Sequence, residues 1–88
     1  MDADLARRAI AHRSTPEDAA VGLVRYLTGR EREVLVRLVR GEDTGAIAAR
    51  MGIRPATARS HIQNVLAKLG VHSRLEAVVL ASRCGIHS

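Results

Sequence analysis

The chain has almost no aromatic residues, which limits the kind of core that it can build. It contains no Trp and no Phe, and its single aromatic side chain is Tyr26. A core must therefore consist of Leu, Val, Ile, Ala and Met, the usual material of packed helices, whereas a sheet would draw on aromatic residues as well. With 47% hydrophobic residues in 88 positions, the sequence predicts one small all-α domain.

The sequence also lacks cysteine pairs and long apolar runs, and we expect no leader segment. The single cysteine, Cys84, cannot form an internal disulfide, which favours a reducing cytoplasm. No run of about 18 or more apolar residues is present, so we expect no membrane span. The N-terminus, Met1–Asp4, is acidic and lacks the basic and apolar parts of a secretory signal.

The residue patterns of enzymes and metal sites are absent too. The sequence holds no pair of catalytic carboxylates, no Gly-rich phosphate loop and no set of four metal ligands. Cys84 and His87 lie close together, but two ligands near a chain end do not make a metal site, and a small buried thiol is the simpler interpretation. We therefore expect no enzymatic activity, no metal and no cofactor.

Acidic residues are missing from the middle of the chain, between Thr44 and Leu75. The net charge is +5, and residues 29–88 account for it with ten basic residues against five acidic ones. The acid-free stretch contains Arg50, Arg54, Arg59, Lys68 and Arg74. Such a stretch attracts a polyanion, although a solvated helical surface can have the same composition.

Residues 1–27 are predicted to form a helical extension or linker. Apolar residues recur at helical spacing over Leu5–Ile10. The run Ser14–Asp18 then combines a hydroxyl cap, a first-turn proline and acids near the positive end of the helix dipole, which predicts a helix start.

Four further helices are predicted within residues 28–88. Capping boxes open the first at Thr28, with Glu31, and the last at Ser73, with Glu76. Glycines end the helices, and the predicted ranges are 28–40, 44–51, 55–69 and 73–83. The middle two are joined only by Gly52–Arg54, and Pro55 constrains the residue before it to an extended backbone. This tight pair is typical of a helix-turn-helix.

Helix 55–69 has one apolar face and one polar face without acids. At about 100° per residue, the apolar residues that gather on one side are Ala58, Ile62, Val65, Leu66 and Leu69. The opposite side carries Ala56, Arg59, Ser60, Gln63, Asn64 and Ala67. Small residues let a helix approach the floor of the major groove, where Arg and Gln pair with guanine and adenine edges. Thr57 and Lys68, nearer the buried edge, suit phosphate oxygens.

A long series of residues in register resembles one family. It begins with the run LTGREREVL at 27–35 and continues to about Ile86 through Gly41, Ile47–Ala48, Ile53, Thr57, Arg59, His61, Asn64, Lys68–Leu69, Val71, Arg74 and Ala77. These residues resemble the LuxR-type, or GerE-type, DNA-binding domain of bacterial transcription regulators, including the output domains of NarL-type response regulators.

The resemblance implies a fold and a set of contacts. The third helix of a four-helix domain would lie in the major groove of double-stranded DNA, with Arg59, Ser60 and Gln63 facing the bases. Backbone contacts would come from Thr57, Asn64 and Lys68. The family also implies a dimer, often through the fourth helix, and RNA polymerase is a further candidate partner. Relatives often carry a receiver or sensing domain, for which 27 residues leave no room, so a fragment of a longer regulator is favoured over a stand-alone one.

Three positions depart from the family pattern. The run Asp43–Ala46 replaces a common Ser-Asn-Lys-Glu, so a basic residue at the head of the second helix is missing. Arg54 replaces the usual Ser before the recognition helix, which weakens the N-cap but adds a charge near the DNA backbone. Ala58 replaces a larger Val.

The helix that begins at Ser73 has apolar residues on two sides, and the core can cover only one of them. One stripe holds Ala77, Leu80, Ala81 and Cys84. The other stripe holds Leu75 and Val79, and we expect Ile86 to continue it beyond Ser82. We interpret these four positions as the interface of a homodimer that binds an inverted repeat. Alternatively, residues 1–27 fold back over this stripe.

Two other functions fit parts of the pattern. A sigma-factor domain that binds a promoter element also uses a helix-turn-helix, but the run 27–35 and the residues after Lys68 argue against it. A helical protein-interaction module without DNA affinity would explain the second apolar stripe.

Overall fold

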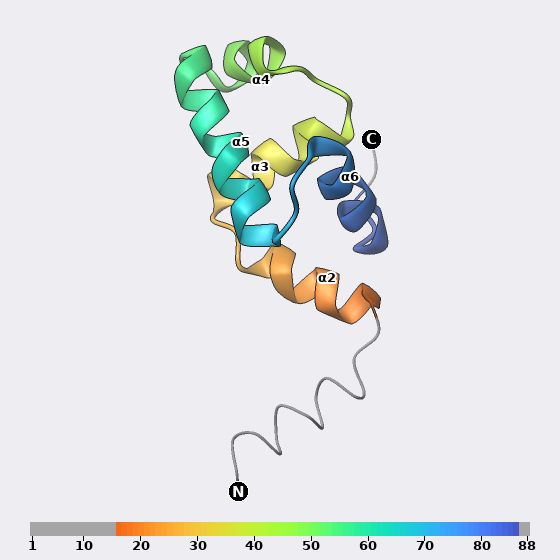
Figure 1. The fold of residues 1–88 in the computed structure, drawn as a ribbon. Coiled ribbons are helices and arrows are strands. Elements are labelled where there is room, and N and C mark those ends of the chain that lie inside the picture. The colour runs from red at the N-terminus through yellow and green to blue at the C-terminus, as the bar shows by residue number, and fades with distance from the viewer. Residues whose placement is uncertain (1–15, 87–88) are drawn as a thin grey trace, which may run out of the picture.

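The computed structural model describes residues 16–86, which form five helices and no strand (Figure 1). The helices are α2 (Pro16–Arg25), α3 (Gly29–Val39), α4 (Thr44–Met51), α5 (Pro55–Leu69) and α6 (Arg74–Arg83). The all-α class and the four predicted helices after Thr28 are therefore confirmed. The helical spacing over Leu5–Ile10 lies outside the described residues. None of the helices within 16–86 has the length and apolar character that crossing a bilayer requires.

Local capping explains where most of these helices begin. The Thr28 hydroxyl accepts a hydrogen bond from the Glu31 N–H at 3.1 Å, and the Glu31 carboxylate accepts one from the Thr28 N–H at 2.9 Å. This reciprocal pair is the predicted capping box of α3. At α4, the Asp43 carboxylate accepts from the Ala46 N–H at 2.8 Å.

The predicted capping box of α6 is only half formed. The Ser73 hydroxyl accepts from the Glu76 N–H at 3.1 Å, as expected. The Glu76 carboxylate, however, accepts from the N–H of His72 at 2.7 Å rather than from that of Ser73. The carboxylate therefore secures the turn before the helix, one residue earlier than the sequence pattern predicted.

The turn between α4 and α5 holds the two helices at a fixed angle. Gly52 has φ +66°, a left-handed conformation that strains residues with a side chain, and it ends α4. The Ile53 N–H then donates back to the Ala48 carbonyl at 3.0 Å. Arg54 is extended and Pro55 opens α5, as the sequence predicted.

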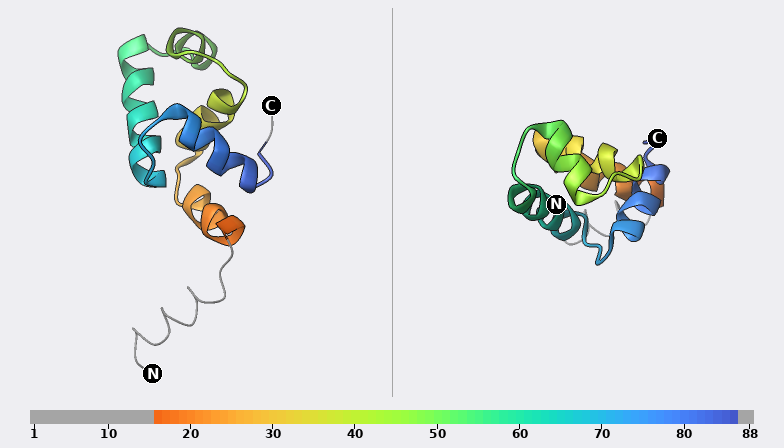
Figure 2. Two further views of the ribbon diagram at one scale, coloured as in Figure 1. Left: turned by 45° about the vertical axis from the view of Figure 1, so that its right-hand side comes forward. Right: turned by 90° about the horizontal axis from the view of Figure 1, so that it is seen from above.

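Helices α3, α5 and α6 surround the centre of the domain (Figures 1 and 2). The core there consists of apolar side chains from every described helix. Its buried hydrophobic members are Val24, Leu27, Val34, Leu35, Leu38, Ile47, Ala48, Met51, Ala58, Ile62, Val65, Leu69, Ala77 and Ala81. Val24 and Leu27 precede the expected domain boundary at residue 28. Helix α2 packs on α5 and α6, so the packed unit includes residues that the sequence assigned to an extension.

The chain reverses direction after α6. This helix ends at Arg83, and Gly85 adopts φ +77°. The Ile86 N–H donates to the Ala81 carbonyl at 3.1 Å, and the Ile86 side chain packs against the core. The expectation that Ile86 continues the apolar stripe of α6 is therefore wrong, because the left-handed turn takes it off the helical path.

Candidate nucleic-acid interface

Helix α5 presents to solvent the face that the sequence predicted. Ala58, Ile62, Val65 and Leu69 are buried in the core. The residues of α5 that are exposed are Pro55, Ala56, Thr57, Arg59, Ser60, Gln63, Asn64 and Ala67. The Ser60 hydroxyl donates to the Ala56 carbonyl at 3.2 Å, which leaves its lone pairs free to accept. The exposed face carries two long polar side chains, Arg59 and Gln63, among small residues.

The N-terminal end of α5 has no side-chain cap. Arg54 occupies the N-cap position, and its side chain makes no capping hydrogen bond. The predicted weakening of this cap is therefore confirmed. The free N–H groups of the first turn form the positive end of the helix dipole, and the exposed side chains of Arg54 and Thr57 lie beside them. This end of α5 is suited to a negatively charged group.

Lys68 is placed differently from the other predicted contacts. Its ammonium lies 2.7 Å from the Glu31 carboxylate, and only 30% of its side chain is exposed. The ammonium also lies over the ring of Tyr26, 5.1 Å from the ring centroid. The sequence predicted an ammonium free for phosphate, whereas this one is paired with an acid 37 residues away.

The Glu31 carboxylate is held ionised by these contacts. Hydrogen bonds from the Lys68 ammonium and the Thr28 N–H lower the pKa of Glu31 below its ordinary value of 4.5, although burial opposes the shift. Because the folded-state pKa is lowered, the carboxylate contributes stability above about pH 4.5, and this contribution is lost as the pH falls through the folded-state pKa.

Charged side chains connect α4 to its neighbours. Arg37 on α3 pairs with Glu42 at 3.4 Å, and Glu42 in turn pairs with Arg50 on α4 at 3.5 Å. At the other end of α4, the Arg74 guanidinium donates to the hydroxyl of Thr44. A cation from α6 therefore lies at the head of α4, where the sequence lacks the basic residue that is common in the family. No local pattern could have indicated this, because the two residues are 30 positions apart.

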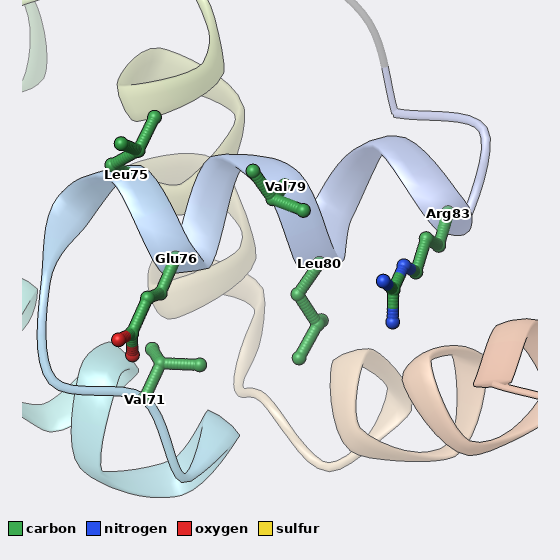
Figure 3. Close-up of a pocket in the computed structure, with 6 residues that line it drawn as sticks. All are labelled: Val71, Leu75, Glu76, Val79, Leu80 and Arg83. Atoms are coloured by element: carbon green, nitrogen blue, oxygen red, sulfur yellow. The ribbon is translucent and has the colours of Figure 1, made fainter.

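The exposed part of α6 includes two apolar side chains, one in the first turn and one near the middle of the helix. Leu75 is 72% exposed and Val79 is 47% exposed. Both line an open hollow of about 390 Å³ together with Val71, Glu76, Leu80 and Arg83 (Figure 3). Ser82 is exposed, and its hydroxyl donates to the Val79 carbonyl at 2.7 Å. Ile86 lies elsewhere, beside a second hollow that Val21, Val24, Arg25, Arg32 and Cys84 line.

The described residues contain no group of three or more His, Cys, Asp and Glu side chains that could hold a metal ion. Cys84 is half-buried, and burial raises the pKa of its thiol above the ordinary value. Its Sγ donates to the Leu80 carbonyl at 3.6 Å. Both properties are those of a packed structural cysteine rather than a reactive thiolate.

Comparison with known proteins matches the sequence of this chain to one family. The family described as "Bacterial regulatory proteins, luxR family" matches residues 25–81. The chain is 48% identical over 59 residues to the spore germination protein GerE of Bacillus subtilis, covering 67% of this chain and 80% of GerE. It is 46% identical over 57 residues to the probable transcriptional regulatory protein NarL of Mycobacterium tuberculosis, covering 65% of this chain and 26% of NarL.

A third relative, the transcriptional regulatory protein DesR of Bacillus subtilis, is 39% identical over 59 residues, covering 67% of this chain and 30% of DesR. The chain thus spans most of GerE but less than a third of NarL and DesR. No solved structure matches it significantly. The family match covers the α4–α5 pair and the core around it, and the chain therefore belongs to the luxR family of bacterial regulatory proteins, with the helix-turn-helix DNA-binding domain of that family.

Proposed function

We propose that this domain binds specific sequences of double-stranded DNA to regulate transcription, with α5 in the major groove. The observation that carries the proposal is the outer face of α5, where Arg59 and Gln63 project among small residues and no acid is present. Small residues allow close approach to the base pairs, and these two side chains match guanine and adenine edges. An exposed helix without such a role more often mixes acids with bases.

Within this proposal the exposed residues of α5 divide into two groups. Arg59, Ser60 and Gln63 contact base edges. Arg54, Thr57 and Asn64 contact phosphates on either side of the groove, where they position the helix without reading sequence. The uncapped N–H groups of the first turn add a partial positive charge toward the DNA backbone.

Selection of bound duplexes from a random DNA pool tests the proposal directly. We expect recovery of a defined sequence, arranged as an inverted repeat if two copies bind together. Recovery of no preferred sequence would contradict sequence-specific binding. It would favour a protein-interaction module, for which the apolar part of α6 is the candidate surface.

We also propose that two copies associate through α6. The hollow of α6 has Glu76 near its N-terminal end and Arg83 near its C-terminal end, with exposed Val79 between them and exposed Leu75 one residue before Glu76. When two such helices pack antiparallel about a two-fold axis, Glu76 of each copy lies opposite Arg83 of the other. The proposed interface keeps Leu75, Val79 and Ser82. The position of Ile86, beside the other hollow, makes it peripheral to this surface.

Binding is expected to depend steeply on salt, because basic side chains displace counterions from DNA. The logarithm of the affinity should fall linearly with the logarithm of the salt concentration, by about 0.9 for each phosphate neutralised. Arg54→Ala should flatten this slope by about that amount on both selected and random duplexes, whereas the charge-retaining Arg54→Lys should not. Titrations at several salt concentrations measure the slopes. If the affinity of the unmodified protein for DNA does not vary with the salt concentration, the DNA-binding proposal is wrong.

Val79→Glu is expected to abolish self-association without unfolding the monomer, because it places a charge in the centre of an exposed apolar surface. Its affinity for a two-half-site duplex should fall toward that for a single half-site. Sedimentation with and without DNA measures both effects, with the isosteric Val79→Thr as the control. If Val79→Glu unfolds the domain, the side chain belongs to the core. If it binds two half-sites as tightly as the unmodified protein, the dimer forms elsewhere.

A further inference from the structure

The ion pair between Glu31 and Lys68 removes a cation from the edge of the proposed DNA-binding surface. Lys68 is the one lysine of the chain and lies in the last turn of α5. It follows Asn64 by four residues, so the two share one strip of the helix, next to the face that carries Gln63. A free ammonium at this position would lie within reach of the phosphates beside α5. In the structure it is instead bound to Glu31.

The Lys68 ammonium has two partners, the Glu31 carboxylate and the Tyr26 ring. The Glu31 carboxylate accepts from Lys68 through the same oxygen, Oε1, that accepts from the Thr28 N–H, so the capping box of α3 fixes its position. Only 8% of the Glu31 side chain is exposed, which excludes most competing water. The Tyr26 ring lies on the ammonium as well. The two partners lie on either side of the turn between α2 and α3, where the Tyr26 N–H donates to the Leu23 carbonyl of α2 at 3.1 Å and Glu31 belongs to the first turn of α3.

We propose that Glu31 limits the affinity of the domain for DNA of every sequence by withholding the Lys68 charge from the DNA backbone. A phosphate contact strengthens binding to every sequence about equally, so it raises the affinity and its salt dependence without changing the ratio of specific to non-specific affinity. An ammonium neutralised within the protein makes no such contribution, and sequence reading by Arg59 and Gln63 then accounts for more of the binding. Glu31 acts through Lys68 and touches no DNA itself. The inference rests on the proposed function.

Glu31→Gln tests the inference, because glutamine keeps the shape of the side chain and an oxygen for the Thr28 N–H but loses the charge. We expect the released Lys68 to steepen the salt dependence of binding to random duplex DNA by about 0.9. The affinity for random DNA at low salt should rise about three- to tenfold, as for one added phosphate contact. The ratio of affinities for selected and random duplexes should stay the same, because the added phosphate contact strengthens both about equally.

Two variants control this experiment. Glu31→Gln combined with Lys68→Met leaves no unpaired buried charge and should restore the salt dependence of the unmodified protein. Glu33→Gln changes the net charge by the same amount on the same helix, but Glu33 pairs with Arg30 and Arg37 rather than with Lys68. We expect the salt dependence of Glu33→Gln to be less steep than that of Glu31→Gln. Circular dichroism confirms that each variant is folded at the temperature of the titrations.

The outcomes separate the inference from the proposed function. If the unmodified protein binds a selected duplex but Glu31→Gln has an unchanged slope, the inference is wrong and the proposed function stands. The inference is also wrong if Glu33→Gln steepens the slope equally, or if adding Lys68→Met to Glu31→Gln does not reverse the effect. If the unmodified protein binds no DNA, both are wrong.

Discussion

Replacing Arg59 or Gln63 with alanine is expected to weaken binding to a selected DNA sequence by about 1–3 kcal/mol each, which corresponds to roughly 5- to 150-fold in affinity. Both side chains are exposed on the outer face of α5 and take no part in the core. The variants should therefore unfold at the same temperature as the unmodified protein. Titration of selected and random duplexes measures the effect, and the loss should be much smaller on random DNA.

A charge-retaining variant refines this experiment. Arg59→Lys keeps the positive charge but lacks the planar guanidinium that donates two hydrogen bonds to guanine. We expect it to keep the affinity for random DNA while losing most of the preference for the selected sequence. Equal losses on selected and random DNA for Arg59→Ala would mean that Arg59 contacts only phosphates, and the assignment of base contacts to this position would be wrong.

Leu35→Ala is expected to destabilise the fold by about 2–5 kcal/mol, because it leaves a cavity among side chains that cannot fully relax into it. Leu35 has 0% exposure in the centre of α3. A domain of this size has a total stability on the order of 5–15 kcal/mol, so a large part of it would be lost. Thermal unfolding should show a fall in Tm of at least about 8 °C.

Leu75→Ala is the matched control for this prediction, since it is the same substitution at a side chain that is 72% exposed. Its effect on monomer stability should lie within about 0.5 kcal/mol. Similar losses for the two variants would show that α6 is covered by another part of the protein in solution. The proposed partner surface would then be wrong, because Leu75 would already be buried.

The sequence by itself determined where most helices begin and end and which face of α5 is exposed. Thr28, Asp43 and Ser73 cap helices through hydrogen bonds that span three residues, and Gly52 ends α4 through its own backbone angle. These interactions are local, so they depend on residue type and spacing alone. The separation of α5 into a buried and an exposed face also follows from the helical period of 3.6 residues, because the apolar positions must face the core.

Only the tertiary structure decided which partners the long charged side chains find. Lys68 pairs with Glu31 across 37 residues, and Arg74 reaches Thr44 across 30. Ile86 leaves the stripe of α6 because a left-handed glycine comes before it, and Val24 and Leu27 join the core through the packing of α2. Such contacts depend on how the helices cross and how far each side chain extends. A lysine near the edge of a basic helix therefore has the same sequence pattern whether it binds phosphate or a buried carboxylate, and only the position of α3 beside α5 distinguishes the two.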